Sequence, residues 1–124
     1  MSISDATKDR GVHNSRVIDL IFEDSENDVI VLQMLEWREW EASRERGEEL
    51  EEKFNSYLDY VLAGHFYAQY PQYSGKRVCF ELSCQAEPPE ELAELLGAMR
   101  EFAESVNISF RLNCEPRAVK PASS

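Results

Sequence analysis

The chain has 124 residues, of which 43% are hydrophobic, so it can enclose one hydrophobic core and is not disordered by composition. Its 24 acidic residues outnumber its 13 basic residues and give a net charge of −11, which argues against binding to nucleic-acid phosphates or to an anionic membrane surface. A basic protein partner would be attracted to such a chain, although acidic charge also serves simply to keep a small domain in solution.

The cysteines and the hydropathy pattern favour a cytoplasmic location. Cys79, Cys84 and Cys114 form no C-x-x-C pattern, and an odd number of cysteines cannot all pair. No apolar run approaches the ~20 residues of a membrane-spanning helix, and the N-terminus lacks the apolar centre of a signal peptide. We therefore expect free cysteines in a reducing compartment.

Both ends of the chain are predicted to be flexible. Residues 1–16 are polar and show no periodicity, and residues 116–124 contain two prolines and end in Ala-Ser-Ser. Residues 17–115 are then expected to form a single domain.

Two apolar segments near the start predict a β-hairpin. In Val17–Glu23, we expect Ile18, Leu20 and Phe22 to share one face, with Asp19 and Glu23 on the other. Residues 24–28 are typical of a turn, and Val29–Leu35 resumes the alternation with Ile30, Leu32 and Met34 on one face.

The next segment predicts a helix that contains a long apolar stripe. Ser43 is the candidate N-cap, acidic residues follow it, and Gly64 supplies the C-terminal stop. The stripe consists of Leu50, Phe54, Tyr57, Leu58, Val61 and Leu62.

After an aromatic-rich connection over residues 65–74, the pattern predicts a strand, a helix and a strand. Val78–Cys84 alternates, and Pro88-Pro89 opens the second helix. The alternation resumes at Ile108 and continues to Cys114, after Asn107 as a left-handed stop. The apolar stripe of this second helix consists of Leu92, Leu95, Leu96, Met99, Phe102, Ala103 and Val106.

The resulting order, β-β-α-β-α-β, predicts an α+β two-layer sandwich with a four-stranded mixed sheet and both helices on one face. The order of the strands cannot be derived from these patterns. The other face of the sheet is expected to be polar, and Glu81 and Arg111 on it are candidates for a cross-strand ion pair.

Catalytic, metal and cofactor motifs are not recognisable in the sequence. His13 and His65 are not in a metal-ligand spacing, and His65 suits the C-terminal end of a helix. The glutamate runs are typical of solvated helix faces, and the glycines are too scattered to form a phosphate loop. We therefore predict no catalytic site, no metal site and no cofactor.

Aromatic residues are the best candidates for binding. Tyrosine and tryptophan are favoured interface anchors. The alternative, which we weigh more heavily for the tyrosines, is that they fasten the 65–74 connection to the core. The candidate binding residues are Trp37, Trp40, Tyr60, His65, Tyr67, Tyr70 and Tyr73.

Several short motifs resemble one family of small, uncharacterised bacterial domains, the DUF6572 family. They are Val17-Ile18-Asp19-Leu20, Leu35-Glu36-Trp37, Glu52 to Leu58, Tyr70-Pro71 and Pro88-Pro89-Glu90. The resemblance covers residues 17–112. It implies a shared fold, but it carries no activity, ligand or functional residue.

Three functional hypotheses are open. The first is a non-catalytic protein-interaction module with a basic partner, for example an immunity-type protein that neutralises a basic toxin. The second is a small-ligand binder or enzyme with a pocket near residues 64–75. The third is a homodimer that buries the open sheet edge or the region of Trp37 and Trp40.

Overall fold

The structure, a computed structural model, describes residues 11–40 and 43–114. Its strands are β1 (Leu20–Asp24), β2 (Val29–Glu36), β3 (Arg77–Cys84) and β4 (Ser109–Cys114). Its helices are α2 (Arg44–Leu62), α3 (His65–Gln69), the 3-10 turn η1 (Pro71–Tyr73) and α4 (Glu90–Ser105).

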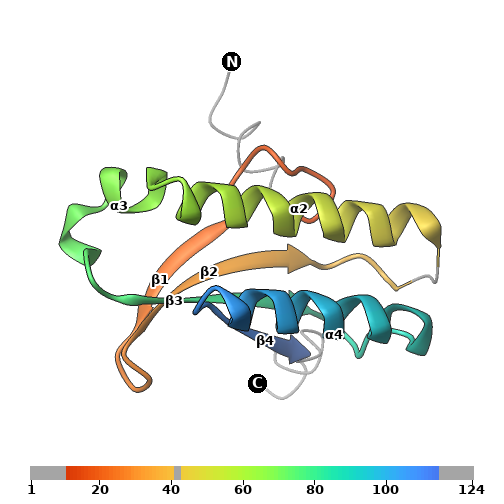
Figure 1. The fold of residues 1–124 in the computed structure, drawn as a ribbon. Helices are drawn as coiled ribbons and strands as arrows, with labels where there is room; N and C mark the ends of the chain where they lie inside the picture. The colour runs from red at the N-terminus through yellow and green to blue at the C-terminus, as the bar shows by residue number, and fades with distance from the viewer. Residues whose placement is uncertain (1–10, 41–42, 115–124) are drawn as a thin grey trace, which may run out of the picture.

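The sheet has the order β1-β2-β3-β4. β1 and β2 form the predicted antiparallel hairpin, and β2, β3 and β4 run parallel to one another. The connections through α2 and α4 advance across the sheet in the same direction, and parallel crossovers are almost always right-handed, so both helices fall on one face. Figure 1 shows α2 and α4 side by side over that face. The predicted α+β two-layer sandwich is confirmed.

The main core lies between the helices and the sheet. Ile30, Leu32 and Met34 of β2 all point into it, as predicted, and are fully buried. The ring of Phe54 on α2 meets that of Phe80 on β3 edge-on at 5.9 Å and that of Phe110 on β4 at 6.0 Å. These contacts pack α2 against the neighbouring parallel strands β3 and β4.

Residues 1–16 were predicted to be flexible, but residues 11–16, which the structure describes, pack against the domain. Val12 is buried in the core, and its backbone N–H donates to the carbonyl oxygen of Leu35 at 2.8 Å. The Nζ atom of Lys53 donates to the carbonyl oxygen of Asn14 at 2.6 Å. The domain therefore includes at least residues 11–16, while residues 1–10 and 115–124 lie outside the described ranges.

The face predicted for the first strand was wrong for Leu20 and Phe22, whereas Ile18, just before the strand, packs against the main core. Ile21 packs against the main core, whereas Leu20 is exposed and Phe22 packs on the opposite side of the sheet. Asp19, predicted to face outward, is buried because its carboxylate accepts hydrogen bonds from Lys53 and from two backbone N–H groups. These polar contacts decide the orientation of β1 against the hydrophobic pattern.

The sheet face that α2 and α4 leave uncovered is closed by its own side chains. The Nε atom of Arg111 lies 2.8 Å from Oε2 of Glu81, which confirms the predicted cross-strand ion pair, and Nη1 reaches Asp24 at 3.0 Å. Val31 and Cys79 are buried on this face. Burial raises the pKa of the Cys79 thiol to about 11, so this cysteine is neutral and inaccessible at physiological pH.

Candidate functional site

The seven predicted binding residues do not form one site. Tyr60, His65, Tyr67, Tyr70 and Tyr73 lie around α3, at the end of α2. Trp37 and Trp40 precede the start of α2, and the 19 residues of that helix span roughly 28 Å at 1.5 Å per residue. Figure 1 shows α3 and the start of α2 at opposite ends of the molecule.

The four tyrosines fasten the connection between α2 and β3 to the core. They surround the fully buried Phe66, whose ring centroid lies 5.0 Å from that of Tyr67, 5.6 Å from that of Tyr70 and 6.1 Å from that of Tyr73. The Tyr67 hydroxyl donates to the carbonyl oxygen of Lys76 at 2.8 Å. Such contacts are expected if the tyrosines hold residues 65–74 against the core.

Tyr60, the fourth tyrosine, and His65 differ in exposure. The Tyr60 hydroxyl donates to Oε1 of Gln69, and partial burial raises the pKa of this tyrosine. His65 follows the left-handed Gly64 and is exposed.

The two tryptophans also differ in their surroundings. Trp40 is half-buried, its indole N–H donates to the carbonyl oxygen of Ala86 at 2.7 Å, and the Arg46 guanidinium lies 5.6 Å from its ring centroid. Trp37 is exposed, and its backbone carbonyl accepts from the side chain of Gln85. Trp40 thus fastens the loop after β2 to the loop after β3.

A network of charged side chains, which was not predicted from the sequence, lies next to the two tryptophans. Glu36 is buried at the end of β2 and accepts from Nε of Arg38 at 2.8 Å and from its Nη2 at 2.6 Å. Nη1 of the buried Arg46 lies 3.5 Å from the same carboxylate. The hydrogen bonds that Arg38 donates to the Glu36 carboxylate raise the pKa of Arg38. The network joins β2 to the first turn of α2.

A second buried charge cluster joins α2 to Asp19, the residue before β1. Lys53 Nζ lies 2.8 Å from Oδ1 of Asp19, and the Tyr57 hydroxyl accepts from the Asp19 N–H and donates to the carbonyl of Gln33. Burial lowers the pKa of Lys53 despite this pairing. Among the described residues, every buried side-chain nitrogen and oxygen has a hydrogen-bond partner, so this cluster offers no unpaired group to a ligand.

The described residues show neither a cluster of metal ligands nor an activated cysteine. Within residues 11–40 and 43–114, no group of three or more histidine, cysteine or acidic side chains is arranged to hold a metal ion. The Sγ atoms of Cys84 and Cys114 lie 3.6 Å apart as free thiols, and burial raises the pKa of Cys84 to about 12. In the same ranges, no helix combines the length and hydropathy needed to cross a membrane.

A pocket does lie near residues 64–75, but its lining differs from the predicted one. A hollow of about 410 Å³ lies beside the connection and is lined by Tyr67, Gly75, Lys76 and Arg77 among others. His65 and Tyr70 do not line it, and no carboxylate does. The combination of histidine, tyrosine and carboxylate that would suit an active site is therefore not assembled there.

An apolar groove of about 230 Å³ lies between α2 and α4. We call it the α2–α4 groove and define its walls by Glu51, Asn55, Leu95, Ala98 and Phe102. The buried rings and chains of Phe54 and Met99 form its floor. Phe102 is 51% exposed, an unusual state for a phenylalanine in a helix that also faces a core.

The groove follows from the width of the apolar arc on α4. At 100° per residue, the seven residues of the predicted α4 stripe span about 120°, with Leu95 and Phe102 at one edge. The rest of that arc faces the core, and Leu92, Leu96, Met99 and Ala103 are buried there. The periodicity of the sequence assigned Leu95 and Phe102 to the core, because it does not show how much of an arc the neighbouring elements cover.

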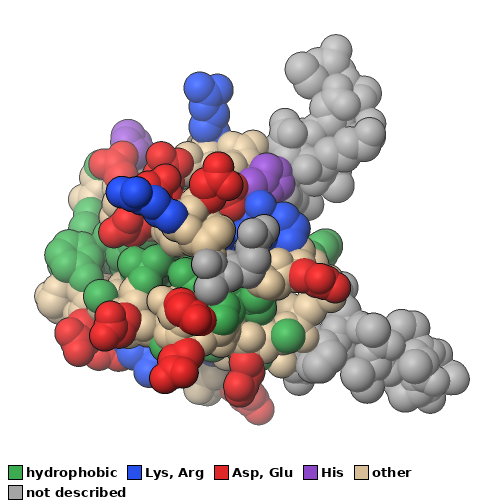
Figure 2. Space-filling model, turned by 90° about the vertical axis from the view of Figure 1, so that its right-hand side faces the viewer, with side chains coloured by type: hydrophobic (Ala, Val, Ile, Leu, Met, Phe, Trp, Pro, Cys, Tyr) green, Lys and Arg blue, Asp and Glu red, His purple; other side chains and the backbone are tan. Residues whose placement is uncertain are grey.

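Acidic side chains dominate the helices on both sides of this groove. The exposed cations of α2 and α4 are Arg44 and Arg100. Figure 2, which views the end of the molecule where α2 begins, shows hydrophobic side chains gathered on one side with acidic side chains above and below them. The exposed carboxylates of the two helices are those of Glu45, Glu48, Glu51, Glu52, Asp59, Glu90, Glu91, Glu94, Glu101 and Glu104.

Comparisons with known proteins place the chain in a family without assigning a site. Searches of curated proteins and of solved structures each find no match to the chain. The model of a family of unknown function, DUF6572, matches residues 10–116, which is most of the chain and includes every described residue. The chain therefore belongs to the DUF6572 family.

Proposed function

We propose that this domain is a non-catalytic protein-interaction module of the cytoplasm that binds a basic segment of a partner protein in the α2–α4 groove. The observation that carries the proposal is the exposed ring of Phe102, beside Leu95 and Ala98, within a helical layer rich in carboxylates. Exposed aromatic anchors surrounded by polar residues are typical of interface centres.

The chemistry of the groove specifies the partner segment. Its apolar walls suit the apolar stripe of an amphipathic helix, which is a recurring mode of peptide recognition. The carboxylates along α2 and α4 suit lysine or arginine on the other face of that helix. An immunity-type role, in which the domain neutralises a basic toxin, is one form of this function.

A second copy of the chain is a poorer occupant of the groove. Each copy carries a net charge of −11, and a dimer through this face would oppose two carboxylate-rich helical layers. Like charges brought together at an interface oppose association. The same electrostatics that disfavour a homodimer here favour a basic partner.

Affinity capture from the source cells tests the proposal. The full-length wild-type chain, Phe102→Ala and Leu62→Ala are compared as baits, because Phe102 is 51% exposed in the groove and Leu62 is 54% exposed outside it. We expect one basic protein to be retained by the wild type and by Leu62→Ala. Removal of the Phe102 ring is expected to weaken binding by roughly 5- to 30-fold, as for an interface hot spot.

The salt dependence of capture separates this proposal from its competitors. Retention is expected to fall between about 0.1 M and about 1 M salt, as the Debye length shrinks from about 10 Å to about 3 Å. Capture that is insensitive to salt or equal for the three baits would overturn the proposal, and so would failure to retain any partner. A dimer seen by sedimentation and abolished by Phe102→Ala would instead assign the groove to a second copy.

A further inference from the structure

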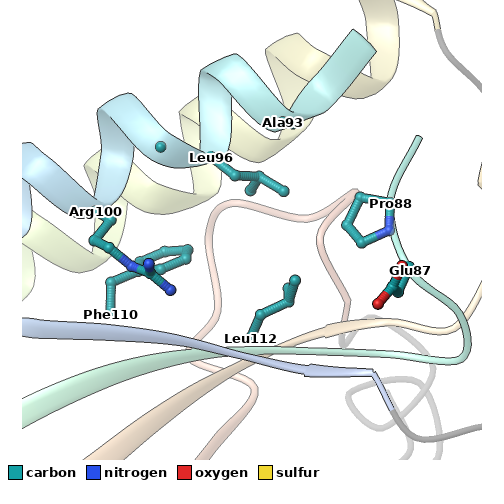
Figure 3. Close-up of a pocket in the computed structure, with 8 residues that line it drawn as sticks. Glu87, Pro88, Ala93, Leu96, Arg100, Phe110 and Leu112 are labelled. Carbon is teal, nitrogen blue, oxygen red and sulfur yellow. The ribbon is translucent and has the colours of Figure 1, made fainter. Parts of the chain in front are cut away.

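A separate pocket lies on the other side of α4, between this helix and the edge strand β4 (Figure 3). Its volume is about 320 Å³, at the small end of the range for ligand sites. Leu96, Phe110 and Leu112 supply most of its apolar lining. One end of the pocket is lined by Glu87 and Pro88, which follow the carboxyl end of β3, the end of a strand where α/β proteins commonly bind ligands.

The pocket exists because α4 presents small residues opposite Leu112. The side chain of Leu112 has the same orientation as that of buried Phe110, toward the helices, yet it is 38% exposed. The α4 residues that face the pocket there are Ala93 and Gly97. A Cβ atom added at Gly97 would meet nothing within 4 Å, so no close contact requires glycine at this position. Glycine also weakens a helix interior relative to alanine.

The two ends of the pocket carry opposite charges. Figure 3 shows the Arg100 guanidinium extending from α4 toward the sheet at one end, and Glu87 at the other end beyond Leu112. Among the ion pairs formed by the described residues, none involves Arg100 or Glu87. A guanidinium without a carboxylate partner is notable in a chain with 24 acidic residues.

We propose that this pocket binds a small monocarboxylic acid with a compact apolar body. The Arg100 guanidinium, a planar fork of donors, pairs with the carboxylate, and the apolar body covers Leu96, Phe110 and Leu112. Glu87 repels a second anionic group at the far end, which disfavours dicarboxylates. The site does not depend on the α2–α4 groove, because it lies on the other side of α4.

Titration of the ¹⁵N-labelled full chain with 3-phenylpropionate, followed by NMR, tests the proposal. An acid of this size is expected to bind with a Kd on the order of 1 mM. The amide signals of Ala93, Gly97 and Leu112 should shift together. Two matched probes, 3-phenylpropan-1-ol without the charge and 1,4-phenylenediacetate with a second carboxylate, are each expected to bind about 10-fold more weakly.

Variants identify the groups responsible. Arg100→Gln should weaken binding of 3-phenylpropionate about 10-fold and remove the preference over the alcohol. Gly97→Leu places a side chain in the pocket and should abolish binding without loss of thermal stability, because the added Cβ has open space. Arg44→Gln, at an exposed arginine of α2, is the control and should bind as the wild type does.

Three results would overturn the proposal: no saturable binding of 3-phenylpropionate, equal binding of the alcohol and the acid, or binding that survives in folded Gly97→Leu. The Phe102→Ala variant distinguishes this site from the groove. It should bind 3-phenylpropionate normally, whether or not the groove binds a protein partner.

Discussion

The Nζ atom of Lys53 lies 2.8 Å from Oδ1 of Asp19, and both side chains are fully buried. Lys53 also donates to the carbonyl oxygens of Asn14 and Val17, so each of its three ammonium protons has an acceptor. The Asp19 carboxylate accepts from two further backbone N–H groups. One side chain of α2 thereby holds the segment before β1 against the domain.

Replacing Lys53 by methionine is expected to lower the free energy of unfolding by about 3–5 kcal/mol, because it leaves the Asp19 carboxylate buried without its cation. Urea denaturation measures the change. Lys76→Met is the control, since the Lys76–Asp28 pair is exposed to solvent and its loss should change the stability little. A Lys53→Met variant as stable as Lys76→Met would show that the pair is not buried in solution.

The buried thiol of Cys79 should make the stability of the protein fall at alkaline pH. Burial raises its folded-state pKa from 9.0 to about 11, so its contribution to stability is complete below pH 9 and is lost as the pH rises toward 11. A tenfold change in an acid dissociation constant corresponds to about 1.4 kcal/mol, so this contribution amounts to roughly 3 kcal/mol.

Urea denaturation of the wild type and Cys79→Ala between pH 8 and 11 tests this linkage. The stability advantage of the wild type over Cys79→Ala should shrink by roughly 3 kcal/mol between pH 8 and 11, because only the wild type carries the Cys79 thiol. Cys84 and the tyrosines are present in both proteins, so their titration cancels in the comparison. Two pH profiles that stay parallel would contradict the burial of Cys79.

Two glycines should respond to alanine in opposite directions. Gly97 lies inside α4 with open space around an added Cβ, so Gly97→Ala should stabilise the protein by about 0.5–1 kcal/mol. Gly64 has a φ of +92° at the end of α2, so Gly64→Ala should destabilise it by about 1 kcal/mol. Thermal unfolding measures both changes, and stabilisation by Gly64→Ala would contradict the left-handed turn.

The tyrosine cluster should behave as a structural fastening centred on Phe66. Phe66→Ala is expected to lower the free energy of unfolding by about 3–5 kcal/mol, because the buried ring contacts four tyrosines. Tyr70→Phe keeps the ring packing and should change stability by less than about 0.5 kcal/mol. Chemical denaturation measures the free energy of unfolding of both variants. A smaller loss of stability in Phe66→Ala than in Tyr70→Phe would contradict the structural role of this cluster.

Local signals in the sequence predicted most of the fold. The Ser43 hydroxyl accepts from the Arg46 N–H at 3.1 Å as an N-cap, and Asn107 has the expected positive φ of 70°. Alternation placed Ile30, Leu32 and Met34 on the core face of β2. These features depend on neighbours within a few residues, which the sequence shows directly.

Long-range pairing explains what could not be predicted. Asp19 and Lys53 each resemble a solvated surface charge when considered alone, and only the fold brings them together across 34 positions. The same pairing turned Asp19 inward and reversed the expected face of β1. Likewise, only the packing of α2 beside α4 shows that Phe102 is left exposed while Met99 is covered.

The measurement that tests the central claim most directly is an NMR titration of the ¹⁵N-labelled full chain with a lysine-rich amphipathic helical peptide. We expect saturable shifts at the amides of Glu51, Leu95, Ala98 and Phe102, which weaken with salt, are lost in Phe102→Ala and persist in Leu62→Ala. Shifts centred instead on the Phe66 tyrosine cluster or on Trp37, or the same titration curve for Phe102→Ala and the wild type, would contradict the account.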